Sequence, residues 1–179
     1  SPPGRRVPEP SARTPATMAP MQGRTIAVIG QGAPDDGPAA AAAEAVGRLL
    51  ARAGATVVTG GLGGVMAAAG RGAREAGGRV VAVLPGTRRD EAREADVAVC
   101  TGVGEARDLA VVASADAVIA VGGGWGTLAE IGLARKLGRP VVLLASWRIE
   151  EPGAPPGAAA CPAAPTPEDA VAMALGALA

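Results

Sequence analysis

A run of glycines between two apolar segments carries the clearest chemical pattern in the chain, at Gly122–Glu130 (GGGWGTLAE). The apolar residues 117–121 before it have the length and the valine and isoleucine content of a buried strand, and a helix is predicted over 127–137. Glycines at such a junction leave backbone N–H groups open, and the first helical turn adds unpaired donors and the positive end of the helix dipole. The pattern predicts an anion, such as phosphate, bound by the amides of Gly123, Gly124, Gly126 and Thr127.

Two further glycine-containing turns follow predicted strands. Residues 59–66 (TGGLGGVM) hold four glycines in five positions, which is more than one tight turn requires, although glycines there could also serve only to allow positive φ angles. We expect these turns to complete the ligand site, with Gly60, Gly61, Gly63 and Gly64 as a facing wall and Gly30 with Gln31 as the floor.

Two charged side chains close to these turns, Glu130 and Arg107, could act on a ligand. Thr127 and Glu130 also have the spacing of a capping box, in which the carboxylate binds its own backbone and is a poorer base. Arg107 lies in the first turn of a helix predicted from Glu105 to Ser114, where a cation opposes the helix dipole. A bound phosphate or substrate oxygen would explain this placement, and a solvated surface arginine is the alternative.

Several nucleotide and metal motifs are excluded. Gly30–Asp35 begins like a dinucleotide fingerprint but has Asp35 where the third glycine is required, and the second predicted strand ends in Thr59 without an acidic residue for an NAD ribose. No P-loop lysine motif occurs. The chain has no histidine, and Cys100 and Cys161 make no metal-binding spacing. Any catalysis must therefore use carboxylates, arginines, hydroxyls and backbone dipoles.

The charge balance gives no sign of a polyanionic partner. Seventeen basic residues match seventeen acidic ones, so the formal net charge is zero and gives no electrostatic footprint for nucleic acid or an anionic membrane. No run of about 18 apolar residues suggests a membrane span. We expect neither nucleic acid nor membrane as a partner.

Short apolar strands alternate with helices from residue 23 to residue 148. This alternation predicts a single doubly wound, Rossmann-like α/β domain, with a mostly parallel sheet of six or seven strands covered on both faces. Ligands of such sheets bind outside the carboxyl ends of the strands, near a topological switch point. The predicted strands are 25–29, 56–59, 80–84, 97–100, 117–121 and 140–144, and the predicted helices are 39–53, 64–76, 105–114 and 127–137.

The composition changes on both sides of this domain. Residues 1–22 are rich in Pro, Arg, Ser and Thr and are predicted to be a disordered extension. Arg5-Arg6 is not followed by an apolar segment, so we expect a cytoplasmic protein and not an exported one. Residues 149–165 form a Pro/Ala-rich linker, and a capped helix is predicted within 166–179. That helix packs either on the domain or on a partner subunit.

Taken together, these residues resemble the LOG-like (Lonely Guy) superfamily, whose members are also described as "lysine decarboxylase-like". Gly122–Glu130 is similar to the superfamily motif PGGxGTxxE, and residues 60–66 are similar to its upstream glycine segment. Arg107 and Glu130 have the separation of the superfamily's catalytic Arg and Glu. The resemblance implies a Rossmann-like fold, a homodimer or higher homo-oligomer, and hydrolysis of the N-glycosidic bond of a nucleoside 5′-monophosphate, with Arg107 and Glu130 as catalytic residues.

The motif also departs from the superfamily pattern. Gly122 replaces the proline, Ala129 replaces a glutamate, and Asp108 replaces the lysine that follows the arginine. The run at 102–107 is closer to a branch that resembles molybdenum-cofactor carrier proteins. Two functions follow from the resemblance, and from the sequence we favour the first. One is a phosphoribohydrolase that needs no cofactor or metal and holds a nucleoside monophosphate or phosphate in its site. The other is a non-catalytic nucleotide or molybdenum-cofactor binding or carrier protein.

Overall fold

The computed structural model describes residues 23–155, 157 and 159–179, so the extension predicted over 1–22 lies outside the described residues. Seven parallel strands form one sheet in the order β4-β3-β2-β1-β5-β6-β7. Their bounds are Thr25–Gly30 (β1), Thr56–Thr59 (β2), Val80–Leu84 (β3), Val97–Cys100 (β4), Ala117–Val121 (β5), Val141–Leu144 (β6) and Ala163–Ala164 (β7). The prediction of a doubly wound, Rossmann-like parallel sheet is confirmed.

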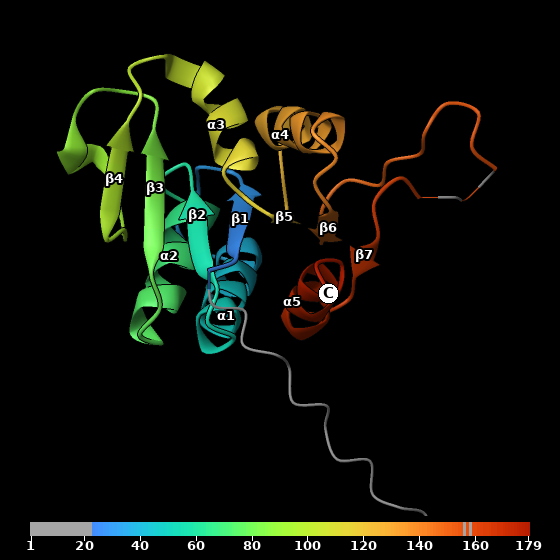
Figure 1. Cartoon of the computed structure of the whole chain (residues 1–179), viewed down its shortest axis with the longest axis horizontal. Coiled ribbons are helices and arrows are strands. Elements are labelled where there is room, and N and C mark those ends of the chain that lie inside the picture. Colours follow the sequence, from blue (N-terminus) through green and yellow to red (C-terminus); the bar gives the residue numbers. More distant parts are fainter. Residues whose placement is uncertain (1–22, 156, 158) are drawn as a thin grey trace, which may run out of the picture.

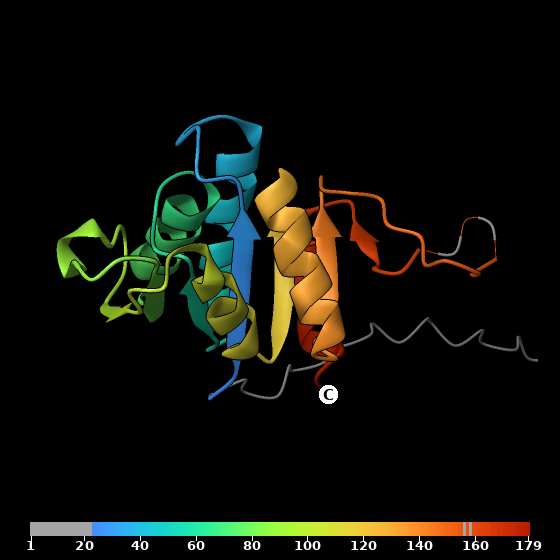
Figure 2. The same ribbon diagram turned by 90° about the horizontal axis from the view of Figure 1, so that it is seen from above.

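Five α-helices cover the two faces of the sheet (Figures 1 and 2). Their bounds are Pro38–Arg52 (α1), Val65–Glu75 (α2), Arg107–Ala113 (α3), Trp125–Lys136 (α4) and Pro167–Gly176 (α5), with short 3-10 turns at Arg89–Glu91 (η1) and Gly104–Ala106 (η2). Helices α1, α2 and α5 lie on one face, and α3 and α4 on the other. Among the helices of the described residues, none has both the length and the apolar character needed to cross a bilayer.

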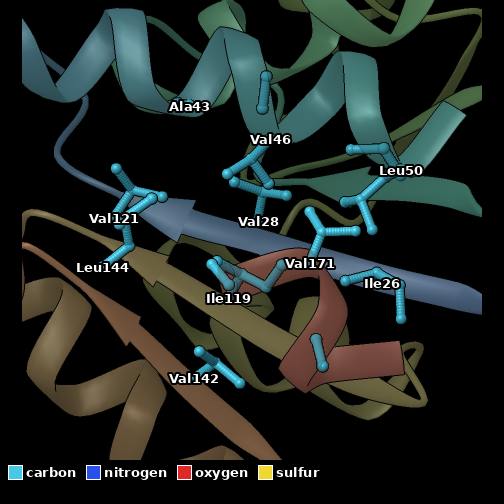
Figure 3. Close-up of a cluster of buried hydrophobic side chains, with 14 of the residues drawn as sticks. Ile26, Val28, Ala43, Val46, Leu50, Ile119, Val121, Val142, Leu144 and Val171 are labelled. Atoms are coloured by element: carbon cyan, nitrogen blue, oxygen red, sulfur yellow. The ribbon is translucent and has the colours of Figure 1, made fainter. Parts of the chain in front are cut away.

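The alternation of side chains along each strand builds two separate cores. In β1, Ile26 and Val28 join the core beneath α1, α2 and α5, whereas Ala27 and Ile29 join the core beneath α3 and α4. This is the period of two expected of a strand with both faces buried. Figure 3 shows the first core between α1 and the central strands, with Val171 of α5 reaching into it.

Small residues let α1 and α2 approach closely. A Cβ added to Gly47 would lie 2.0 Å from the carbonyl oxygen of Ala69, and one added to Gly72 would lie 2.0 Å from that of Glu44. Because neither contact could be relieved without moving backbone, these two glycines set the distance between the helices. A chain with so few aromatic residues fills its core by bringing backbones together.

The C-terminal segment packs on the domain. Val171, Ala174 and Leu175 of α5 are buried in the first core beside β6 and α1. The side chain of Thr166 caps the helix by accepting a hydrogen bond from the N–H of Asp169 at 3.1 Å. The two-residue strand β7, which the alanine-rich composition did not predict, adds one edge to the sheet beside β6.

The strand order reverses between β1 and β5. The chain builds β1 to β4 outward in one direction, then returns to place β5 on the other side of β1. The two helices that follow these strands lie on opposite faces, so their connections separate and leave a crevice at the carboxyl ends. Figure 2 shows α4 beginning at this edge of the sheet.

Candidate functional site

A cavity of about 350 Å³ opens at the carboxyl ends of β1 and β5. We call it the Glu130 cavity. It brings together seven of the residues predicted from the sequence: Gly30, Gln31, Arg107, Gly124, Gly126, Thr127 and Glu130. It is also lined by residues that the sequence did not single out as ligand contacts: Gly32, Ala33, Leu62, Met66, Glu105 and Asp108.

The N-terminus of α4 forms one wall of this cavity with free donors. The helix begins at Trp125 with Gly124 as its N-cap residue, and no side chain caps it. The first helical hydrogen bond runs from the N–H of Leu128 to the carbonyl oxygen of Gly124, at 3.1 Å. The amides of Trp125, Gly126 and Thr127 therefore have no partner within the helix. Such donors, with the positive end of the helix dipole, suit an anion.

The capping-box interpretation of Thr127 and Glu130 is wrong. The helix starts two residues earlier than predicted, so Thr127 is its third residue and Glu130 lies beyond the first turn. From there the Glu130 carboxyl group cannot bind the N-cap amide, and it lines the cavity instead. The early start follows from Gly122 and Gly123, whose φ angles of +60° and +138° turn the chain directly after β5.

Gly123 supports the turn and is not among the residues that line the Glu130 cavity. A Cβ at this position would lie 3.0 Å from the Cβ of Thr127, in a backbone conformation that disfavours other residues. Gly123 instead lines a neighbouring cavity on the other side of the same turn. The structure thus places Gly124, Gly126 and Thr127 at the first cavity and Gly123 at the second.

The glycine turn after β2 is closed by the protein itself. A Cβ on Gly64 would lie 2.2 Å from the carbonyl oxygen of Gln31, and one on Gly61 would lie 2.7 Å from the Cβ of Ala82. The N–H of Gly64 donates to the carboxylate of Asp35. Gly60, Gly61, Gly63 and Gly64 are not among the lining residues, and Leu62 and Met66 present this turn to the cavity.

Asp35 therefore replaces a ligand at the start of α2. Its carboxylate accepts from the N–H of Gly64 and forms an ion pair with Arg93 at 2.8 Å. The backbone hydrogen bond and the arginine lower the pKa of Asp35 below its ordinary value. Asp35, the residue that breaks the dinucleotide fingerprint, thus fills the N-terminus of α2, whereas the N-terminus of α4 faces the cavity.

Arg107 is buried, so the alternative of a solvated surface arginine is wrong. Only 9% of the residue is exposed, and its Nη1 atom lies so close to the backbone of Gly60 that a Cβ there would be 2.1 Å away. Nη1 pairs with the carboxylate of Asp108 at 3.1 Å. The buried Nε atom has no hydrogen-bond partner in the described part of the chain. Buried arginine donors are normally satisfied, so this one is available to a ligand.

Glu130 lies in the same cavity without a hydrogen-bond partner among the described residues, and Arg107 pairs with Asp108. Arg107 and Glu130 therefore line one cavity without an ion pair between them. Burial raises the pKa of Glu130 to about 8, and the negative charge of Asp108 adds to the effect while Arg107 opposes it. At neutral pH the Glu130 carboxyl group holds its proton, which makes it an acid and not a base.

Asp108 is the main residue at this site that sequence reasoning did not recognise. It stands where the superfamily has a lysine, and here it pairs with Arg107 and faces Glu130. Burial raises the pKa of Asp108, and the charge of Arg107 opposes that rise. The departure from the superfamily motif was the signal that could have identified it.

Comparison with known proteins finds a matching family model, a related sequence and similar solved structures. The model of the SLOG cluster4 family matches residues 23–160. An uncharacterized protein of Archaeoglobus fulgidus is 45% identical over 120 residues, which are 66% of this chain and 78% of that protein.

Two solved structures are similar over most of the chain. The molybdenum cofactor binding protein of the phototrophic bacterium Rippkaea orientalis has a TM-score of 0.78 and 30% identity, covering 89% of this chain and 99% of that one. The Moco carrier protein of Chlamydomonas reinhardtii has a TM-score of 0.72 and 32% identity, covering 87% of this chain and 99% of that one.

Proposed function

The chain belongs to the SLOG cluster4 family, in a LOG-like branch close to the molybdenum cofactor carrier proteins, and from this premise we propose that it binds and carries a phosphorylated small molecule. The proposed ligand is a molybdenum-cofactor-type pterin or a nucleotide. Its phosphate would lie at the N-terminus of α4, and no bond of the ligand would be broken.

The observation that carries this proposal is the pairing of two kinds of unused donor in one cavity. The amides of Gly126 and Thr127, which line the cavity, have no helical partner, and the buried Nε of Arg107 has no partner in the described part of the chain. Both kinds are suited to the oxygens of a phosphate monoester. Leaving the buried Nε of Arg107 without a partner costs free energy, about 1–3 kcal/mol.

The helix amides and Arg107 supply the attraction for a phosphate in this cavity, because the other charged lining residues, Glu105 and Asp108, are acidic. Arg107 supplies the only basic side chain among the lining residues that the structure describes, and Asp108 already neutralises part of it. A protonated Glu130 adds no negative charge at neutral pH and can donate a hydrogen bond to a ligand oxygen. We expect helix amides and Arg107 to hold the phosphate, with Glu130 as a neutral donor beside it.

Calorimetric titration of the full chain with inorganic phosphate, ribose 5-phosphate, GMP and a pterin monophosphate tests the proposal. We expect each to bind, and binding to weaken at least tenfold in Arg107→Ala. The control is Arg52→Ala, which removes an arginine at the end of α1, away from the cavity. A carrier also returns its ligand intact. If none of these four compounds binds at millimolar concentration, the proposal is wrong.

A second candidate function, hydrolysis of a nucleoside 5′-monophosphate, is favoured by the protonated state of Glu130. In this reaction the bond between the base and C1′ of the ribose breaks, and Glu130 gives its proton to the departing nitrogen. Water adds its oxygen to C1′ and returns a proton to the Glu130 carboxylate. The products are free base and ribose 5-phosphate, and no other reactant is needed.

Chromatography after incubation with a panel of nucleoside 5′-monophosphates separates the two candidates. Under the hydrolase proposal, free base appears and Glu130→Gln lowers its release at least about a hundredfold. Glu91→Gln, in the short turn η1 and outside the cavity, should leave release unchanged. Intact recovery of every monophosphate would leave the carrier function as the one supported.

A further inference from the structure

The two tryptophans are the only aromatic residues of the chain. Trp125 is the first residue of α4 and Trp147 follows β6, and the two side chains meet beside the glycine turn. The Trp125 side chain is the most exposed large apolar group of the described residues, at 78%. It is nevertheless held in place. Its ring lies against that of Trp147 with centroids 5.2 Å apart and planes tilted by 40°, and the indole Nε1 of Trp147 donates to the carbonyl oxygen of Gly124 at 3.2 Å. The protein thus keeps an ordered aromatic surface next to the open helix N-terminus.

Trp147 also lines a second cavity, of about 380 Å³, which we call the Trp147 cavity. Its other lining residues are Gly122, Gly123, Ala145, Ser146 and Arg148. The two cavities lie on either side of one turn, because Gly123 lines this cavity and the adjacent Gly124 lines the Glu130 cavity. A ligand whose phosphate lies at the start of α4 would therefore be next to the Trp147 cavity.

The polar side chains of the Trp147 cavity can form hydrogen bonds in addition to those they make within the protein. The buried Oγ of Ser146 has no hydrogen-bond partner in the described part of the chain. Arg148 extends into solvent with its side chain 75% exposed, and it approaches Glu150 only at 3.5 Å. Ala145, which precedes them, has a φ of +49°, uncommon for a residue other than glycine. The Arg148 guanidinium can only donate hydrogen bonds, and the Ser146 hydroxyl can donate one. Both groups therefore suit a hydrogen-bond acceptor on a ligand.

We propose that the Trp147 cavity receives the ring of the ligand, a planar fused nitrogen heterocycle with a keto oxygen, which stacks on the aromatic pair and directs that oxygen to Ser146 and Arg148. The proposal rests on the proposed phosphate site, and it specifies which class of ligand occupies it. Guanine and pterin both present such a keto edge. Adenine presents an amino group at the corresponding position, and Arg148 has no acceptor atom for that group. Ring stacking on tryptophan tolerates either ring, so the keto group provides the selectivity.

The test compares ligands that differ only in the ring, by calorimetry on the full chain. Ribose 5-phosphate carries the phosphate alone, AMP adds an amino ring and GMP adds a keto ring. We expect GMP to bind about tenfold or more tightly than ribose 5-phosphate. Trp125→Ala should remove this advantage and leave ribose 5-phosphate unchanged, whereas Trp125→Phe should keep most of it. Arg148→Ala should lower the affinity for GMP to that for AMP.

A matched control is Val97→Ala, which removes an apolar side chain of similar surface position, 46% exposed on the edge strand β4. It should change no affinity. Equal binding of GMP, AMP and ribose 5-phosphate, unaffected by Trp125→Ala, would overturn the ring site and leave the phosphate site standing.

Two ligands without phosphate, guanosine and neopterin, make the two proposals separable. Binding of either that depends on Trp125, with no binding of inorganic phosphate or ribose 5-phosphate, would support the ring site and overturn the phosphate site. If no ligand of the set binds, both are overturned. Quenching of tryptophan fluorescence in Trp147→Phe, which retains Trp125 as its single tryptophan, reports directly on stacking.

Discussion

The junctions β2–α2 and β5–α4 have the same local design and opposite outcomes. Each places a glycine-rich turn between a buried strand and a helix that begins at a glycine N-cap residue without a side-chain cap. The first turn is filled by the protein, because Asp35 accepts from the N–H of Gly64 and the backbone of Gln31 lies against it. The second is open to a cavity, where a Cβ on Gly126 would meet no atom within 4 Å.

The two carboxyl groups near these helices differ in the same way. Asp35 has a backbone and an arginine partner, and its pKa is lowered. Glu130 is buried without a hydrogen-bond partner among the described residues, and its pKa is raised to about 8. Glycine content therefore identifies a possible ligand turn, but the group that faces the turn decides whether a ligand is needed there. The following variants test this contrast.

The largest effect is expected from Glu130→Gln on the pH dependence of stability. The folded-state pKa of Glu130 is about 8 and its ordinary value is 4.5, so between these pH values the folded protein keeps a proton that the unfolded chain has lost. The free energy of unfolding therefore falls as pH rises through this window, by about 3–5 kcal/mol in total. Glu130→Gln should remove this loss. Urea unfolding at pH 5 and pH 8 measures it.

The exposed Glu168, in the first turn of α5, provides the matched control for that experiment. Glu168→Gln should leave the pH dependence as in the unmodified chain. If Glu130→Gln and the unmodified chain lose stability equally between the two pH values, Glu130 is ionised in the folded state and the acid role fails.

Gly64→Ala should destabilise the closed turn by about 2–4 kcal/mol. Its Cβ would lie 2.2 Å from the carbonyl oxygen of Gln31, and the residue has a φ of +61°. Neither problem can be relieved by a side-chain rotation. The control is Gly132→Ala in α4, where nothing lies within 4 Å and helix propensity should raise stability by up to about 1 kcal/mol. Urea midpoints compare the two, and a tolerated Gly64→Ala would contradict the closed turn.

Gly124→Val should affect binding more than folding. Gly124 has a φ of −112°, which other residues adopt, and the nearest atom to an added Cβ is the side-chain nitrogen of Gln31 at 3.8 Å. We expect a stability change below about 1 kcal/mol. The branched side chain would cover the amides of α4, so the affinity for inorganic phosphate should fall tenfold or more in calorimetry. Unchanged affinity would place the phosphate elsewhere.

The smallest effect is expected from Asp35→Ala, which opens the closed turn. The lowered pKa means that Asp35 stabilises the fold above its ordinary value near 3.8, and this contribution disappears as pH falls through the lowered pKa. The variant should therefore be less stable than the unmodified chain at neutral pH and equal to it in strong acid. It also frees the amide of Gly64 close to Arg93, so added sulfate should raise the melting temperature of the variant more than that of the unmodified chain.

Much of the architecture could be predicted from local sequence patterns. Valine- and isoleucine-rich strands of four to six residues, separated by helices, led directly to a parallel sheet. The principal errors concern the residues at which elements begin and one short strand that was missed. The start of α4 moved by two residues because the φ angles of Gly122 and Gly123 were not visible in a capping pattern. Strand β7 was missed because two alanines carry no period.

The sequence by itself determined that glycine turns at strand ends could face an anion, because strand ends and helix starts are local properties of glycine content and apolar period. Only the tertiary structure decided which of two similar turns stays open. That decision depends on contacts between distant segments: Asp35 with Gly64, Arg107 with Gly60, and Glu130 with Asp108. The burial and the pKa of a side chain are set by such contacts, because they depend on the groups around it in space and not on its neighbours in the sequence.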